Sequence, residues 1–423
     1  AVKTAIASSG ITTSSSYAVT LTDASVSVAD ANIVAADTTG VVTATITERD
    51  MAKLGLLRDE AGNAYTVTVT DASVAASELN TLDGKTTVAI EATAVGTLTG
   101  LVADVKTAIA SSGITTATDY AATLTDVSVS VADANIVDAD TTGVVTATIT
   151  ERDMATLGGL TGTGNAYAVT VTDASVAASA LNTLDGKTTV TIDATAVRTL
   201  TGSAADIAIA ISAATIDTAR DVGVDISAGP ASALDLLTID PNTVAWVDAS
   251  RVTEVTGLIA DVLAALDVRG LNLQPNVNAT VSDDAVDAFS LRLLDLKTRG
   301  VVAVADATSL SGSYADVHAV LTSTGVTGWT DPSVTLMGPL TATQANALAL
   351  LTSGIVTAEI AAGSATSINA ALTGAAGTDA LTITLTDASI TANLLNTLDG
   401  KTSVAVDAAS VVAVAGSLAA LTA

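Results

Sequence analysis

Hydrophobic and polar positions follow two alternating patterns along the chain. Runs in which every second residue is apolar, such as Tyr65 to Val69 and Val88 to Ile90, predict half-buried β-strands. Segments with leucines three residues apart and a following glycine, such as Leu79 to Gly84, predict short helices that bury one face. One strand and one helix alternate in this way, and the pair, here called a repeat, recurs every ~24 residues.

This alternation predicts the fold class. Strands joined by short helices pair in parallel through right-handed crossovers, which places a sheet on one side and helices on the other. We therefore expect a right-handed parallel α/β solenoid of about sixteen coils, each similar in length to a leucine-rich repeat. The buried asparagine that leucine-rich repeats stack beside each strand has no counterpart in these coils, so the ligand binding of that family is not expected.

The chain also contains longer copies, each of which comprises several repeats. Val2 to Gly10 matches Val105 to Gly113, and two near-identical copies span residues 3–105 and 106–207. Residues 208–423 are diverged copies that keep the same pattern, and no stretch resembles a linker. We expect one continuous body over residues 1–423. Because the chain opens and closes inside a repeat, we also expect it to be a fragment of a longer chain.

Composition argues against catalysis. Hydrophobic residues make up 49% of the chain but aromatic residues only 2%, which suits thin layers of Ala, Val, Ile and Leu. The chain has one histidine, His318, and no cysteine. It therefore lacks the usual ligands of zinc, haem and iron–sulfur clusters, and also the usual nucleophile and base of acyl transfer. We predict no catalytic residue, no cofactor and no enzyme activity. The net charge of −28 repels nucleic acid and anionic lipid.

Acidic residues close the predicted strands and are the candidate site. In the two near-identical copies they are Asp23, Glu48, Asp71, Glu91, Asp126, Glu151, Asp173 and Asp193. Equivalent positions on stacked coils lie about 4.8 Å apart, so we expect carboxylates such as Asp71 and Glu91 to stack at one edge of the sheet. Two interpretations are open: each acid caps the helix that follows it, or the rows hold calcium between coils.

Threonines and isolated large side chains are assigned to the surface or to packing. Thr43 and Thr45 belong to rows of alternating threonines expected on a solvated sheet face. Trp246 and Trp329 are expected to fill local cavities, and His318 to lie exposed on a helix. The arginines of the diverged copies are expected to pair with local acids. The nearly uncharged stretch from Pro332 to Thr378 is too rich in polar residues for a membrane span.

Two sequence blocks carry a resemblance. Leu-Asn-Thr-Leu-Asp-Gly-Lys-Thr-Thr-Val, at residues 79–88, and Thr-Asp-Ala-Ser, at residues 70–73, resemble the degenerate repeats of very large cyanobacterial cell-surface and S-layer-like exoproteins. The resemblance implies an extracellular structural protein in a surface layer, filament or sheath, whose partners are copies of itself or flanking repeats. A calcium-dependent adhesin, or a module that binds a glycan or a partner, is the alternative.

Overall fold

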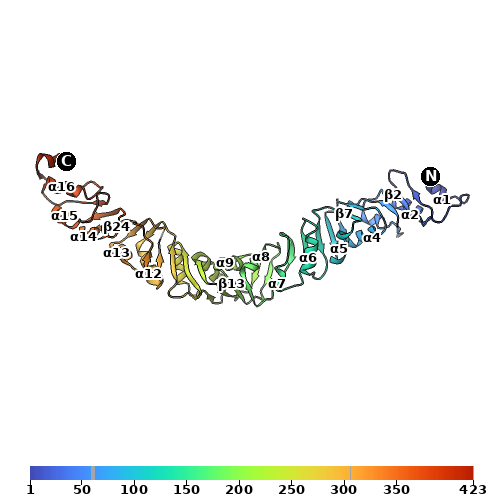
Figure 1. The fold of residues 1–423 in the computed structure, drawn as a ribbon, viewed down its shortest axis with the longest axis horizontal. Coiled ribbons are helices and arrows are strands. Elements are labelled where there is room, and N and C mark those ends of the chain that lie inside the picture. Colours follow the sequence, from blue (N-terminus) through green and yellow to red (C-terminus); the bar gives the residue numbers. More distant parts are fainter. Residues whose placement is uncertain (59–61, 305, 423) are drawn as a thin grey trace. The chain divides into compact units, whose positions relative to one another are not determined.

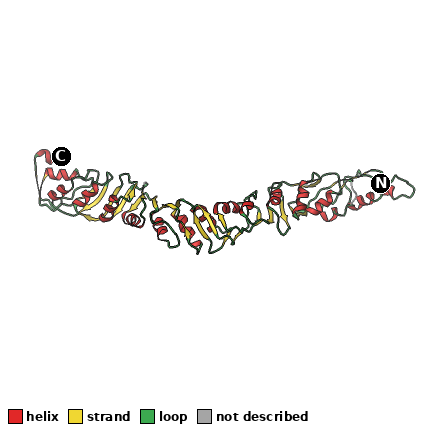
Figure 2. Ribbon diagram, turned by 60° about the horizontal axis from the view of Figure 1, so that its bottom comes forward, coloured by secondary structure: helices red, strands yellow, loops and turns green. Residues whose placement is uncertain are grey.

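Short helices and parallel strands alternate along the chain, as Figures 1 and 2 show for this computed structural model. The structure describes residues 1–58, 62–304 and 306–422. Contacts gather into two compact units, which are described separately. Unit 1 comprises Ala1–Thr199 and Ala213–Ala219, and unit 2 comprises Leu200–Ser212 and Arg220–Ala423. Each unit belongs to the α/β class, as the sequence predicts.

Unit 1 contains helices of four to nine residues, and each helix after α1 follows one or two strands. Its helices are α1 (Val2–Ile6), α2 (Val28–Ala35), α3 (Met51–Leu54), α4 (Ala76–Asp83), α5 (Val102–Ala110), α6 (Val131–Asp138), α7 (Met154–Leu157) and α8 (Ala178–Asp185). Its strands are β1 (Val19–Thr20), β2 (Val42–Thr45), β3 (Ala64–Thr66), β4 (Ser73–Ala75), β5 (Ile90–Ala92), β6 (Thr97–Gly100), β7 (Ile114–Thr116), β8 (Ala121–Leu124), β9 (Val145–Thr148), β10 (Ala166–Ala168), β11 (Ser175–Ala177), β12 (Ile192–Ala194) and β14 (Ile216–Thr218).

Unit 2 continues the same alternation, and β13 (Thr199–Gly202) lies where the two units divide. Its helices are α9 (Ala204–Ser212), α10 (Ala233–Ile239), η1 (Asp240–Asn242), α11 (Ile259–Asp267), α12 (Ala288–Lys297), α13 (Tyr314–Thr322), α14 (Ala342–Ala349), α15 (Ala365–Ala371), α16 (Ala392–Asp399) and α17 (Leu418–Leu421). Its strands are β15 (Gly223–Ile226), β16 (Gly229–Ser232), β17 (Val247–Asp248), β18 (Val252–Gly257), β19 (Asn278–Val281), β20 (Ala285–Asp287), β21 (Val302–Ala303), β22 (Ser309–Gly312), β23 (Val326–Thr327), β24 (Ser333–Leu340), β25 (Val356–Ile360), β26 (Ala380–Thr382), β27 (Ser389–Thr391) and β28 (Ala413–Ala415).

Each strand pairs in parallel with a strand one repeat away. In unit 1, β4 pairs with β6 with Ser73 beside Thr97, β6 pairs with β8, and β8 pairs with β9. In unit 2, β20 pairs with β22 and β27 with β28 in the same manner. Helices of successive repeats also contact each other, for example α4 with α5 and α12 with α13. The predicted parallel pairing of neighbouring repeats is therefore confirmed.

The strands are shorter and more divided than the sequence pattern suggests. Val67 to Val69 lies outside β3, yet the Val69 N–H donates to the Glu91 carbonyl at 2.8 Å and the Glu91 N–H to the Val67 carbonyl at 3.0 Å. Within the described residues the strands form several small sheets instead of one continuous sheet. The strands are two to eight residues long, and most have two to four residues.

The core is built mainly from Val, Leu, Ile and Ala, as composition predicts, but three tyrosines are among its largest members. Tyr65, Tyr120 and Tyr167 are almost fully buried. The Tyr120 hydroxyl donates to the Asp140 carboxylate at 2.8 Å. Burial, together with this carboxylate, raises the pKa of Tyr120. The repeated positions of these tyrosines were not singled out from the sequence.

Buried threonines tie adjacent repeats together. The Thr86 hydroxyl donates to the Tyr65 carbonyl at 2.8 Å and accepts the N–H groups of Tyr65 at 2.9 Å and Val88 at 3.1 Å. One donor and two lone pairs are the full capacity of a hydroxyl. Comparable buried threonines, all of which follow helices, are Thr38, Thr141, Thr188, Thr243, Thr298, Thr352 and Thr402. By contrast, the alternating threonines of β2 and β9 lie exposed, as predicted.

Buried asparagines occur too, which corrects the expectation that they have no counterpart. Asn63 is 3% exposed and its side-chain oxygen accepts the Val42 N–H at 2.9 Å. Asn165 is 2% exposed and accepts the Val145 N–H at 2.8 Å. They were missed because they alternate with the buried threonines at this position: Asn63 lies one repeat from Thr38 and from Thr86, so no single residue type forms a row in the sequence.

Some glycines bring a strand close to the helix of the preceding repeat. Gly100 has φ +140°, and Gly312 has φ +151°. A Cβ on Gly312 would lie 3.1 Å from the Ala288 Cβ, at the first residue of α12. Both conformation and space therefore favour glycine at this position.

We predict that Gly312→Ala lowers the free energy of unfolding by about 1–3 kcal/mol, because the left-handed conformation and the contact with Ala288 both oppose a side chain. Gly84→Ala is the matched control. Gly84 caps α4 at φ −63° and its added Cβ would meet nothing nearer than 3.5 Å, so this change should leave stability unchanged or raise it by about 0.4–1 kcal/mol. Urea unfolding followed by circular dichroism measures both, and equal midpoints for the two variants would contradict the prediction.

Candidate functional site

Most of the predicted acidic residues accept a hydrogen bond from the repeat before their own. Asp71 accepts the N–H of Met51, the first residue of α3, at 2.9 Å. Asp126 accepts the N–H of Val102, the first residue of α5, at 2.7 Å. Glu48, Glu151 and Asp173 contact Val28, Val131 and Met154 in the same way, at 2.9, 3.0 and 2.8 Å. In unit 2, Asp283 and Asp387 repeat the contact on Ile259 and Ala365.

The predicted direction of capping is therefore wrong for these acids. Each strand ends beside the helix of the preceding repeat, and several residues separate the acid from the helix that follows it. Helices α2 and α6 also have a local cap: Ser27 and Ser130 accept the N–H groups of Asp30 and Asp133 at the third helical position. A local hydroxyl and a carboxylate from the next repeat thus satisfy two of the four N–H groups that a helix start leaves free.

The remaining predicted acids are placed differently. Glu91 accepts a hydrogen bond from the Thr93 hydroxyl, and Asp193 accepts the Thr195 hydroxyl at 2.7 Å, so both close local turns. Asp23 is exposed, and the described residues provide no N–H donor to its carboxylate.

The acids do not form one stacked row. Glu91 lies beside Thr68, so Asp71 is three residues beyond it along the neighbouring strand and the expected Asp71–Glu91 stack is absent. Like charges do stand in register at Asp193 and Asp217. In the part of the chain that the structure describes, no three His, Cys, Asp or Glu side chains are grouped as a metal site would require.

A lysine binds the end of the short helix α3, whose start is capped by Asp71. The Lys85 ammonium is buried and donates to the carbonyls of Gly55 at 2.8 Å and Leu57 at 2.6 Å, just after α3 ends. Asp71 and Lys85 of one repeat therefore hold opposite ends of the helix in the repeat before it. This agrees with the helix dipole, which favours an anion at the start and a cation at the end. The Lys401 ammonium contacts the Leu372 carbonyl after α15 in the same way.

Ion pairs between repeats lower the pKa of several exposed acids. The Lys106 ammonium donates to the Asp133 carboxylate at 2.7 Å and, with the Ser130 hydroxyl, lowers the pKa of Asp133. A lowered pKa means that the folded state favours the ionised carboxylate. Its contribution to stability is therefore present above the ordinary pKa of aspartate and is lost as the pH falls through the lowered value.

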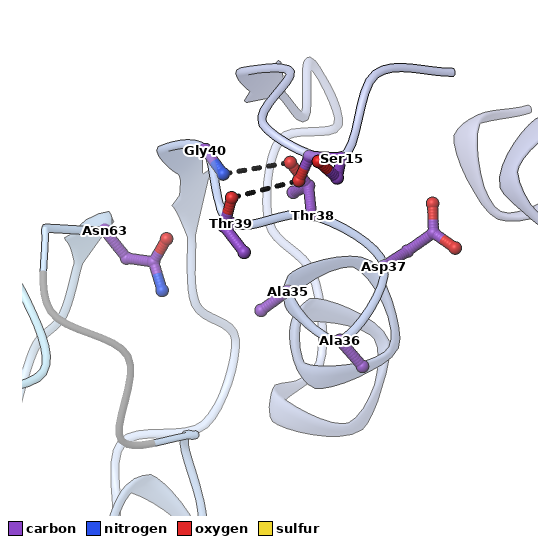
Figure 3. A pocket seen from close by; sticks show the side chains of 8 residues that line it. All are labelled: Ser15, Ala35, Ala36, Asp37, Thr38, Thr39, Gly40 and Asn63. Atoms are coloured by element: carbon purple, nitrogen blue, oxygen red, sulfur yellow. Dashed lines mark hydrogen bonds between the residues drawn. The ribbon is translucent and has the colours of Figure 1, made fainter.

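Small hollows lie on the surface of the described residues. Figure 3 shows one of about 400 Å³ beside the turn from Thr38 to Gly40, where Thr39 donates to the Ser15 carbonyl at 3.0 Å. Asp37 points away from the other side chains drawn, and Asn63 is occupied with the Val42 N–H. No titratable pair faces this hollow among the described residues.

No family model matches the chain, and neither does any curated protein. The site therefore has to be judged from its own geometry. That geometry consists of side chains from one repeat that satisfy backbone groups of the repeat before it.

The isolated large side chains correct two expectations, those for Trp246 and His318. Trp246 is 74% exposed and fills no cavity, whereas Trp329 is half-buried. His318 is half-buried on α13, with its ring 5.5 Å from that of Tyr314. The arginine expectation holds for Arg251 and Arg292, which pair with Asp225 and Asp316. No described helix combines the length and the hydropathy needed to cross a bilayer.

We expect Asp71→Ala to lower the free energy of unfolding by about 1 kcal/mol, because the Met51 N–H loses its acceptor and α3 loses an anion at its start. Asp71→Asn keeps an acceptor oxygen and should cost less. Glu91→Ala is the control: it removes an acid of the same predicted row that caps no helix and should stay within about 0.5 kcal/mol of the wild type. Denaturant midpoints provide the measurement. Equal losses from Asp71→Ala and Glu91→Ala would refute capping across repeats.

Proposed function

We propose that this protein is an extracellular structural repeat protein, a right-handed parallel α/β solenoid that forms part of a cell-surface layer, filament or sheath. The observation that carries the proposal is the contact set between neighbouring repeats. Strand pairing, buried threonines such as Thr86 and cross-repeat caps such as Asp71 recur along both units. A chain whose polar side chains join one repeat to the next by hydrogen bonds is suited to bearing load.

Two further features support this proposal. The conspicuous acids are engaged in capping, as Asp126 is, or in local turns, as Asp193 is. The resemblance of the Leu79 to Val88 block to large exoproteins supports the extracellular location, and the charge of −28 favours solubility outside the cell. Copies of the chain or flanking repeats are the proposed partners.

Antibody labelling of the cells that make the protein tests this function. Intact cells should be labelled as strongly as permeabilised cells, and negative-stain images of shed material should show labelled layers or fibres. An antibody against an interior cell protein is the control for membrane integrity. Label that appears only after permeabilisation would refute the extracellular role.

A calcium-dependent adhesin is the second candidate. It is favoured by Asp193 and Asp217, which lie side by side in register on two neighbouring strands. Among the described residues, no Lys or Arg is seen to form an ion pair with either of them. Like charges in that position repel unless a cation screens them.

If calcium is structural, a chelator should lower Tm by more than a few degrees, and Asp217→Asn should abolish that response. Added calcium should restore the Tm of the wild type, and magnesium serves as the control for ionic strength. A Tm that is the same with chelator and with calcium would eliminate this candidate and leave the structural role.

A further inference from the structure

Trp246 is a large apolar side chain that lies on the surface of unit 2. It is 74% exposed, although it is one of only two tryptophans in the chain. It stands directly before β17, whose first residue, Val247, is fully buried. Because most of the indole is in contact with water, it offers a flat apolar surface to a partner.

The corresponding position of the second copy shows that this tryptophan is a departure from the repeat. The buried hydroxyls of Thr188 and Thr243 donate to the carbonyls of Tyr167 and Val222, which aligns the two repeats. Three residues after Thr188 lies an exposed threonine, residue 191, and three residues after Thr243 lies the tryptophan. An aromatic ring therefore replaces a threonine of the exposed rows.

The neighbouring strands leave space beside the indole. Strand β15 pairs with β17 in the register that places Gly223 beside Trp246. On the other side the next repeat places Gly270 beside it. A Cβ on Gly270 would lie 2.0 Å from the Asp240 Oδ1, so a carboxylate occupies that side. No side chain of β15 stands directly beside the ring, and a flat ligand can approach it from there.

Charged and polar groups follow Trp246 along the same side of the sheet. Asp248 lies two residues, about 7 Å, further along the strand, and Asp225 lies beside Asp248 in register. The Arg251 guanidinium pairs with Asp225, so it reaches back to this side from the turn after β17. The Ser250 hydroxyl and N–H, together with the Arg251 charge, lower the pKa of Asp248, which keeps this carboxylate ionised as a hydrogen-bond acceptor.

A polar hollow opens beside the same turn. It has a volume of about 370 Å³, and Ser250 and Arg251 belong to its lining. The other polar residues of the lining are Thr253, Gln274, Asn276 and Asn278, and none of the lining residues is Asp or Glu. Gln274 and Asn276 are exposed, and no hydrogen bond to their side chains is seen among the described residues. In a chain with 44 acidic residues, this hollow therefore presents mainly neutral amides and hydroxyls.

These features indicate the chemistry of a ligand. The hydroxyls of a sugar are donors and acceptors that suit amide, hydroxyl and guanidinium groups, and the C–H face of a sugar ring suits the face of an indole. Binding sites of this kind combine an aromatic surface with a few polar groups that fix orientation. An anionic ligand is disfavoured by Asp240, Asp248 and the net charge of −28.

We propose that Trp246 and the hollow beside Ser250 form a binding site for a neutral oligosaccharide. One sugar ring stacks on the indole, and a following ring hydrogen-bonds with Gln274 and Asn276. Trp246 and Ser250 are four residues apart, so their Cα atoms are at most about 14 Å from each other, which a few linked sugar rings can span. The site goes beyond the proposed structural role, which can hold without it, and it uses no calcium.

Calorimetric titration of the purified chain, in the presence of a chelator, tests the proposal. The probes are cellohexaose, mannohexaose and chitohexaose, with a hexamer of galacturonate as the anionic control. At least one neutral hexasaccharide should bind, and the galacturonate hexamer should not. If none of the three neutral probes binds, or if binding needs added calcium, the proposal is overturned, the second result in favour of the calcium-dependent adhesin.

Substitutions locate the site. Trp246→Ala should weaken binding about tenfold and leave Tm unchanged, because the ring is stacked on the ligand but packs little against the protein. Phe289→Ala is the matched control: it removes a ring that is 59% exposed on α12 and should leave binding unchanged. Gln274→Ala and Asn276→Ala should each weaken binding about fivefold, as expected for the loss of one hydrogen bond.

Equal binding by the wild type and Trp246→Ala, or equal losses from Trp246→Ala and Phe289→Ala, would contradict this location of the site. These results do not bear on the surface labelling of cells, so the glycan site and the structural role are decided separately.

Discussion

Each repeat of this protein depends on the next for hydrogen bonds that its own residues cannot make. A short helix leaves N–H groups free at its start and carbonyl groups free at its end, and a strand leaves a whole edge free. In the four-residue helix α3 the unsatisfied groups outnumber the internal bonds. Asp71 and Lys85 of the following repeat satisfy them at either end, so α3 is stabilised by its neighbour more than by its own length.

The turn after each strand contacts the start of the preceding repeat's helix in one of two ways. Where the next repeat supplies an acid, the helix that the acid caps begins with a larger residue in most cases. Asp126, for example, caps α5, which begins with Val102. Where it supplies a glycine with positive φ, the helix that the glycine contacts begins with alanine. Gly312, for example, lies against Ala288, the first residue of α12. The first arrangement satisfies an N–H with a charge, and the second lets the backbones approach closely. Substituting one residue type alone would break the match between two repeats.

This dependence explains why polar residues are buried in a chain with so few aromatic residues. The layers between repeats are thin, and Thr86 or Asn63 can reach backbone groups of the neighbouring repeat from within them. The Thr86 hydroxyl and the Asn63 side-chain oxygen are both hydrogen-bonded there, so they fix the register without being left unpaired.

The sequence by itself determined the elements that depend on local pattern. Leucine spacing and the glycine after Asp83 located α4, alternating apolar residues located the strands near Val67 and Ile90, and the repeat length determined parallel pairing. The sequence did not reveal which repeat each polar side chain serves. Asp71 lies closer in sequence to the helix after it, yet it caps the helix before it, and Thr86 and Lys85 bond to groups more than twenty residues away. Only the stacking of repeats decides those partners, because parallel strands bring residues about one repeat apart into contact while consecutive residues diverge around the turn.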